Sequence, residues 1–160
     1  VAYLPQVNNV FANLNVKENL LMAGYILGKD EASERTREVL EDFPVLKEYM
    51  GRRAGTLSGG ERQMLAMAMA MMRRPQVILF DEPTASLAPK MAIEVLNKIL
   101  HLRDNYGITI MLAEQNARRA LEHGDQAILL VSGKLMYEGD SKELLSHKDL
   151  GKVYLGIKTE

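Results

Sequence analysis

Two adjacent carboxylates follow a short apolar segment in the middle of the chain. Residues 77–80 are all apolar, and Asp81, Glu82 and Pro83 come directly after them. A short apolar run is typical of a buried strand, and open α/β sheets bind ligands beyond the carboxyl ends of their strands. There an aspartate can help to hold Mg²⁺, and a neighbouring glutamate can polarise a water molecule. Taken alone, the pattern is weak, and an ordinary acidic turn explains it better.

A glycine pair in front of an apolar helix offers a second kind of chemistry. The segment reads Leu57-Ser58-Gly59-Gly60-Glu61-Arg62-Gln63, and a methionine-rich stretch follows it. Glycines let the backbone approach a ligand closely, and a helix N-terminus presents unpaired N–H groups and the positive end of its dipole. Together they would bind an anion without a lysine. By itself, the segment is better explained as a turn in which Ser58 caps the helix.

The elements around these segments predict an α/β fold. To about Arg74 the chain has mostly helical periodicity, and after that strands alternate with helices, which predicts a mostly parallel sheet. The last two strands are close enough for an antiparallel hairpin. The charged helix at 31–42, with Glu31 and Arg35 at the spacing of helical neighbours, is expected to present a solvated face. Asn15 and Asp140, each with a glutamate three residues on, are predicted to cap helices. The helix at 89–104 is expected to carry Pro89 in its first turn and to keep its apolar residues on one face. Predicted helices cover residues 16–27, 31–42, 61–72, 89–104 and 116–122, and predicted strands cover 1–4, 76–80, 108–113, 127–131 and 135–137.

Composition excludes several classes of function. The chain carries 20 basic and 21 acidic residues, for a net charge of −1. It therefore lacks the basic excess of a nucleic-acid-binding protein, and we expect no nucleic-acid partner. It contains no cysteine, so disulfides and thiol chemistry are excluded. The longest apolar run, residues 64–72, is much shorter than the roughly 20 residues that span a bilayer. Contact with a membrane would have to go through a partner protein.

The two segments occur in an order that resembles the ABC ATPases. Residues 57–63 match the signature of that family, residues 77–83 match its Walker B strand, and Tyr3-Leu4-Pro5-Gln6 is similar to its Q-loop. The resemblance covers essentially the whole chain. It implies a partial P-loop NTPase core with a mostly parallel sheet plus a helical subdomain. Residues 1–74 would hold the Q-loop and the helical subdomain, ending in the signature helix, and residues 75–160 the C-terminal part of the RecA-like core.

The resemblance also implies cofactors and site residues. ATP and Mg²⁺ are the expected cofactors, and a second ABC ATPase subunit would complete each nucleotide site. Asp81 and Gln6 would hold the metal, and Glu82 and Gln115 would act in catalysis. The expected nucleotide-binding residues are Gln6, Leu57, Ser58, Gly59, Gly60 and Glu61.

Departures from the general family pattern narrow the resemblance. Gln115 stands where the switch residue is usually histidine, and Ala88 replaces the usual aspartate of the D-loop. Glu114-Gln115-Asn116 and Leu87-Ala88-Pro89, with the tail at 153–156, resemble the second ATPase subunit of branched-chain amino acid importers. Importers of urea and short amides share these features. A non-transport ABC ATPase is a further alternative, but residues 7–56 have no sustained heptad repeat. A non-catalytic interaction module is another.

No P-loop is present in the sequence. The pairs Gly28-Lys29, Gly133-Lys134 and Gly151-Lys152 each lack the preceding glycine and the following Ser or Thr that the motif requires. The family has this loop upstream of the Q-loop, so we expect it to precede Val1 in the intact protein. The 160-residue chain is then expected to be inactive alone. The intact protein would lie on the cytoplasmic side of the membrane, peripherally, with transmembrane permease subunits and a homologous or identical ATPase subunit as partners.

Overall fold

The computed structural model describes residues 1–146, and the tail motif at 153–156 lies outside the described residues. The chain forms two compact units, Val1–Glu114 and Gln115–Glu160. The division at residue 74, which follows from the family resemblance, stays a prediction.

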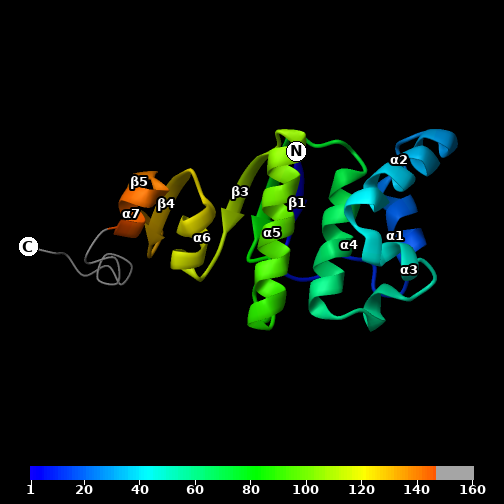
Figure 1. The fold of residues 1–160 in the computed structure, drawn as a ribbon, viewed down its shortest axis with the longest axis horizontal. Coiled ribbons are helices and arrows are strands. Elements are labelled where there is room, and N and C mark those ends of the chain that lie inside the picture. Colours follow the sequence, from blue (N-terminus) through cyan, green and yellow to red (C-terminus); the bar gives the residue numbers. More distant parts are fainter. Residues whose placement is uncertain (147–160) are drawn as a thin grey trace, which may run out of the picture. The chain divides into compact units, whose positions relative to one another are not determined.

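The first unit contains a parallel three-stranded sheet (Figure 1). Its strands are β1 (Ala2–Leu4), β2 (Val77–Asp81) and β3 (Thr109–Ala113), in the order β1-β2-β3. The pairing is in register, with Leu4 opposite Phe80 and Asp81 opposite Ala113. The predicted parallel sheet and the opening strand are therefore confirmed. All three strands end at the same edge, which brings the residues that follow them together.

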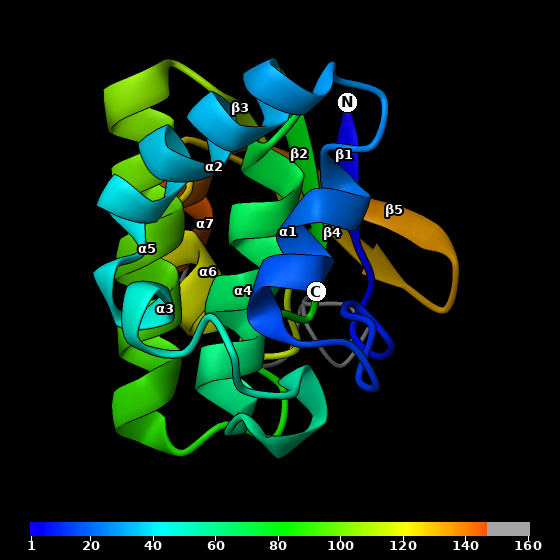
Figure 2. The same ribbon diagram turned by 90° about the vertical axis from the view of Figure 1, so that its right-hand side faces the viewer.

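Helices cover this sheet and share its core (Figure 2). They are α1 (Val16–Ala23), α2 (Lys29–Asp42), α3 (Pro44–Glu48), α4 (Gly59–Met71) and α5 (Pro89–Tyr106), with a 3₁₀ turn at Ala54–Thr56. The face of α5 predicted to be apolar is buried, and Pro89 occupies its first turn. One continuous apolar cluster includes Leu20, Leu46, Met67, Ile78 and Leu102, so helices and strands depend on the same core.

Asn15 caps the N-terminus of α1, as the sequence predicts. Asn15 Oδ1 accepts the N–H of Glu18 at 2.8 Å, and Glu18 Oε2 accepts the N–H of Asn15 at 2.8 Å. This reciprocal pair is a capping box, which satisfies two N–H groups that the helix leaves without partners.

The charged helix α2 departs from expectation at one residue. Arg35 is buried, and its guanidinium donates from Nε and Nη2 to the carbonyl oxygen of Met71, at 3.2 and 2.6 Å. Spacing had suggested an ordinary ion pair with Glu31 on a solvated face. The bond to Met71 joins residues that are 36 apart in the chain, so helical periodicity alone could not predict it.

The second unit contains a hairpin between two short helices. Its elements are α6 (Ala117–His123), β4 (Gln126–Val131), β5 (Lys134–Asp140) and α7 (Ser141–Ser146). The strands pair antiparallel, and Ser132 and Gly133 both have positive φ, as the tight turns of two-residue hairpins require. Asp140 Oδ1 accepts the N–H of Glu143 at 3.1 Å and so caps α7, as predicted. Among the described residues, no helix combines the length and apolar character that crossing a membrane requires.

The buried side chain of Asn19 holds the loop between β1 and α1 in place through hydrogen bonds. Its Oδ1 accepts the N–H of Phe11 at 2.8 Å, and its Nδ2 donates to the carbonyls of Phe11 and Asn15 at 3.1 and 2.9 Å. The side chain is fully buried. An amide that bonds backbone on both sides fixes the path of this loop without any regular secondary structure.

We expect Asn19→Ala to lower the free energy of unfolding by about 2 kcal/mol, because it leaves buried backbone groups of the loop without partners. Urea-induced unfolding followed by circular dichroism measures this change. The matched control is Asn13→Ala, an exposed amide in the same loop, which should change stability by less than about 0.5 kcal/mol. Equal stability of the two variants would contradict this role of Asn19.

Candidate functional site

The carboxyl edge of the sheet joins two of the predicted site residues. Gln6 follows β1 and Glu82 follows β2, and Gln6 Nε2 donates to Glu82 Oε2 at 2.8 Å. The residues are 76 apart in sequence, and the parallel pairing of β1 with β2 brings them together. An amide and a carboxylate in contact can orient a small polar molecule bound beside them. The structure thus unites Gln6 with Glu82, as the sequence suggested.

Asp81 has a partner that the sequence did not indicate. The hydroxyl of Tyr3 donates to Asp81 Oδ2 at 3.1 Å. This bond to the carboxylate raises the pKa of the Tyr3 phenol, with smaller contributions from desolvation and from the charge of Asp81. Tyr3 orients the carboxylate, while the second oxygen, Oδ1, has no described bond. A tyrosine in a short strand is too common a feature to have identified this role.

Glu82 adopts an unusual backbone conformation. Its φ is +47°, a region that costs a residue with a side chain roughly 1–2 kcal/mol. Its N–H donates to the carbonyl of Ala113 at 2.9 Å, and its own carbonyl accepts the N–H of Ala85 at 3.1 Å. These two bonds hold the chain in a sharp turn immediately after the strand. Strain of this kind concentrates where a side chain must be held in one particular direction.

Glu114 supports the same turn from β3. Its Oε1 accepts the N–H of buried Thr84 at 3.1 Å. Glu114 ends the first unit and comes directly after β3. In the sequence, Glu114 is recognisable only as part of a family pattern. Its contact with Thr84 depends on the pairing of β2 with β3, which periodicity does not reveal.

The N-terminus of α4 forms the second group of predicted residues. Ser58 is exposed and caps the helix: its Oγ accepts the N–H of Glu61 at 3.3 Å, and Glu61 Oε2 accepts the N–H of Ser58 at 2.7 Å. The backbone bond from Ser58 is the main reason why the pKa of Glu61 lies below its ordinary value. Ser58 is therefore both the structural cap that the simpler interpretation predicts and an exposed polar group.

The glycines of this segment pack closely against the loop before α5 and against its first turn. A Cβ at Gly59 would lie 2.8 Å from Leu87 Cδ2, and one at Gly60 would overlap the end of the Met91 side chain. The start of α4 therefore approaches the start of α5 closely. Since Leu87 belongs to the loop after β2, the glycine segment and the acidic edge of the sheet are parts of one packed structure.

The remaining predicted residues differ in their surroundings. The side chain of Leu57 is buried, and its carbonyl accepts Arg62 Nη1 at 2.7 Å. Gln115 is exposed and is the first residue of the second unit. Among the residues described, no three His, Asp or Glu side chains gather to hold a metal ion. A Mg²⁺ ion that is bound through one or two carboxylates and phosphate oxygens does not need such a cluster.

We expect the Glu61 carboxylate to stabilise the fold in a pH-dependent way. Because its pKa is lowered in the folded state, the stabilisation is present above the unfolded pKa of about 4.3 and is lost as pH falls through the folded pKa. The difference in unfolding free energy between wild type and Glu61→Gln should therefore shrink on acidification. Urea titrations at several pH values measure it, with exposed Glu94→Gln as control. A difference that stays constant down to strong acid would contradict the assignment.

The chain matches a known family and named relatives. The ABC transporter family model matches residues 1–85, more than half of the 160 residues. The probable branched-chain amino acid transport ATP-binding protein LivF of Archaeoglobus fulgidus is 53% identical over 98% of this chain, which spans 66% of that relative. The high-affinity branched-chain amino acid transport ATP-binding protein BraG of Pseudomonas aeruginosa is 41% identical, again over 98% of this chain and 66% of the relative.

The fold is also similar to that of a solved ATP-binding cassette. The solved ADP conformation of MJ1267, an ATP-binding cassette of an ABC transporter, superposes with a TM-score of 0.81 at 26% identity, over 97% of this chain and 68% of that one. The chain thus spans just under two thirds of the length of the curated relatives, and it has the α/β fold of an ABC cassette. On the family match, the chain belongs to the ABC transporter family.

Proposed function

We propose that this chain belongs to the ATP-hydrolysing subunit of an importer for branched-chain or other hydrophobic amino acids. The observation that carries the proposal is the contact of Gln6 with Glu82 directly beside Asp81, at the carboxyl edge of the sheet. The names of LivF and BraG support the class of solute. ATP hydrolysis in the intact protein follows from family membership.

Asp81 is the proposed metal-binding carboxylate. Tyr3 donates to Oδ2 and turns the carboxylate so that Oδ1 can face a ligand, and oxygen donors of this kind suit Mg²⁺. When bound, Mg²⁺ and the ATP phosphates supply an electrophilic phosphorus with its charge partly neutralised. Gln6 offers a second oxygen, from an amide whose nitrogen is already bonded to Glu82.

Glu82 is the proposed group that orients and polarises the attacking water. Its turn is held by Ala113 and Ala85, and its carboxylate by Gln6, so its position costs little further ordering when a substrate binds. Gln115 is proposed as the group that contacts the γ-phosphate. A glutamine amide donates a hydrogen bond to a phosphate oxygen but carries no charge and does not titrate, so this contact would be insensitive to pH.

The glycine segment is proposed to serve the nucleotide of a second ATPase subunit. The capping box uses the lone pairs of Ser58 Oγ and leaves the O–H proton as a donor. The N–H groups at the start of α4 and the dipole of this helix favour an anion. Leu57, Gly59, Gly60 and Glu61 shape this turn. ATP would then be held between two subunits, whether identical or homologous.

Exposed apolar side chains support a membrane partner. Val7, Phe11, Leu21, Met22, Tyr25 and Ile26 are all exposed within a short stretch of the first unit. Large exposed apolar side chains that occur together are typical of protein interaction sites. By the family resemblance, residues 7–14 of this stretch would lie near the groove that receives a permease subunit, although packing beneath the helical subdomain would also explain them. The intact protein would therefore bind peripherally to permease subunits on the cytoplasmic side of the membrane.

Glu82→Gln tests the proposed catalytic role in the protein expressed from its complete gene. We expect ATP turnover to fall at least about 100-fold, while ATP still binds and holds the dimer closed. Phosphate release and size-exclusion chromatography with ATP measure the two effects. Exposed Glu94→Gln is the matched control and should turn over normally. Normal turnover in Glu82→Gln would remove Glu82 from the reaction.

The 160-residue chain by itself should hydrolyse ATP negligibly, because it contains no lysine in a phosphate-binding loop. A clean preparation should show no Mg²⁺-dependent phosphate release above the Glu82→Gln variant of the same chain. The protein from the complete gene is the positive control. Mg²⁺-dependent activity that the Glu82→Gln change abolishes would show that the chain needs no such loop.

A further inference from the structure

The far ends of α4 and α5 are joined through a third helix. Both helices begin near the site: Ser58 caps α4, and α5 starts directly after the loop that follows β2. The helices lie side by side (Figures 1 and 2) and end at the opposite, amino edge of the sheet. Helix α2 makes polar contacts with the end of each of them. Two separate sets of hydrogen bonds carry this connection.

The first set holds the end of α4. Arg35, from the middle of α2, donates twice to the carbonyl of Met71, the last residue of α4, and its Nη1 donates to Glu38 Oε2 at 2.6 Å. Glu38 also accepts from Arg74 at 3.2 Å, and these two guanidinium groups hold the pKa of Glu38 below its ordinary value. A cation on the last carbonyls of a helix is favourable for its dipole. The Arg35 side chain is only 8% exposed, so the bond to Met71 is well shielded from water.

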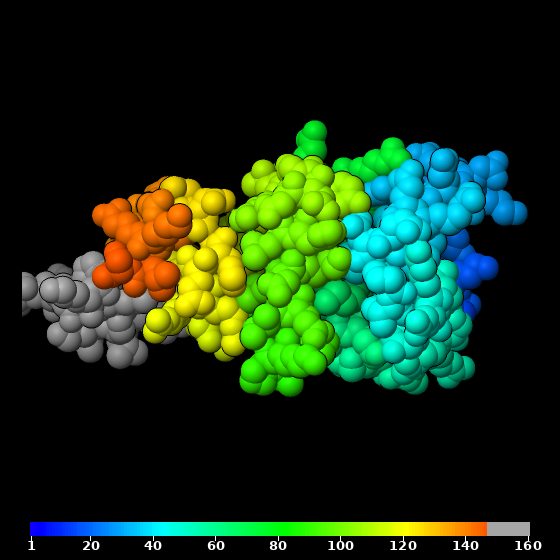
Figure 3. Space-filling view, viewed as in Figure 1, coloured from blue at the N-terminus to red at the C-terminus, as the bar shows by residue number. Residues whose placement is uncertain are grey.

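The second set holds α5. Asp42 ends α2, and its side chain is 12% exposed. Asp42 Oδ1 lies 2.9 Å from His101 Nε2, and Oδ2 accepts the hydroxyl of Tyr106. Lys98 Nζ donates to the backbone carbonyl of Asp42 at 2.5 Å. Three residues of α5 thus bind one residue of α2, and Figure 3 shows the surface of the α2–α3 segment meeting that of α5.

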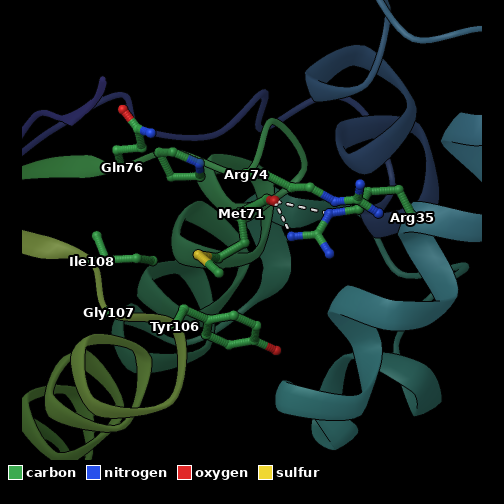
Figure 4. Close-up of a pocket in the computed structure, with 8 residues that line it drawn as sticks. Arg35, Met71, Arg74, Gln76, Tyr106, Gly107 and Ile108 are labelled. Atoms are coloured by element: carbon green, nitrogen blue, oxygen red, sulfur yellow. Dashed lines mark hydrogen bonds between the residues drawn. The ribbon is translucent and has the colours of Figure 1, made fainter.

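A cleft lies between the two sets of hydrogen bonds. It has a volume of about 410 Å³ and is lined by Arg35, Met71, Arg74, Tyr106 and Ile108, among others. Figure 4 shows Arg35 and Tyr106 on different sides of it, with the two bonds from Arg35 to Met71. Met71 and Ile108, which line the cleft, also belong to the apolar core. The hydrogen bonds of Arg35 and Tyr106 are the polar contacts beside this open space.

We infer that Arg35 and Asp42 are positioning residues: through α2 they fix the angle between α4 and α5, and thereby the placement of the Ser58-Gly59-Gly60 turn relative to Asp81 and Glu82. Gly59 and Gly60 let the near ends of the two helices touch at Leu87 and Met91. This contact is apolar and does not by itself fix the rotation of α4 relative to α5. Helix α4 has 13 residues, roughly 20 Å in length, so a small rotation at Met71 displaces Ser58 noticeably. The inference rests on the proposed function only for its effect on turnover.

The first arm of the test measures geometry in the 160-residue chain. The chain has no cysteine, so nitroxide labels can be placed on Glu34→Cys in α2 and Asn97→Cys in α5, both exposed. Wild type should give one narrow distance distribution. Arg35→Met and Asp42→Ala should broaden or shift it, and Arg35→Lys, which keeps one donor for Met71, should restore part of the change. Distributions identical to wild type in both variants would overturn the inference.

The second arm measures turnover in the protein expressed from its complete gene. Arg35→Met and Asp42→Ala should each lower kcat by about 10- to 100-fold, because a misplacement of about 1 Å far from the chemistry can cost up to about 100-fold. The affinity of the single subunit for ATP should stay within about twofold of wild type. The double variant should lower kcat by less than the product of the two single fold-changes, because both substitutions act through α2. The control is Val39→Ala, a buried apolar change on α2, compared at equal folded fraction.

The outcomes separate the inference from the proposed function. A loss of kcat in Arg35→Met no greater than in Val39→Ala would overturn the positioning role, whatever the distances show. A wild-type protein without ATPase activity would refute the proposed function, and the distance measurement would then decide alone whether Arg35 and Asp42 fix the helices.

Discussion

The in-register pairing of three parallel strands is the constraint on which the candidate site depends. It sets Leu4 opposite Phe80 and Asp81 opposite Ala113, so that the chain leaves all three strands at one edge. Gln6, Glu82 and Glu114 then follow three different strands and contact the same turn. A slip by one residue would reverse the direction of every side chain in the moved strand, and would separate Gln6 from Glu82. Covered apolar residues such as Ile78 and Phe80 oppose that slip.

The glycine segment follows from a similar packing requirement. Gly59 and Gly60 are usually explained by what they let a ligand approach, but here they also let α4 approach Leu87 and Met91. The proposed ligand role and this packing are compatible, because the turn that caps α4 with Ser58 leaves its outer side exposed while its inner side packs on Leu87 and Met91. The close contact therefore brings the exposed side near the loop after β2, while its rotation depends on the contacts of α2 at the other end of the helix.

The sequence predicts those features that depend on local spacing. The capping roles of Asn15, Ser58 and Asp140 are visible within four residues, and the buried face of α5 follows from its periodicity. Contacts of Tyr3 with Asp81, and of Arg35 with Met71, join residues 78 and 36 apart. They depend on strand order and on helix crossing, which no local pattern encodes. The continuous apolar run at 77–80 also predicts two buried faces, whereas Val77 and Leu79 are only half-buried.

The strained turn at Glu82 shows how these levels combine. A residue with a side chain prefers to avoid positive φ, and nothing local to Glu82 supplies a glycine or an asparagine there. The bond of its N–H to Ala113 is a continuation of the β2–β3 ladder, and Glu114 holds Thr84 just beyond it. Hydrogen bonds to Ala113 and Glu114 thus offset the free energy that the positive φ of Glu82 costs. Because this support comes from β3, the direction of the Glu82 carboxylate depends on the pairing of β2 with β3 as much as on Glu82 itself.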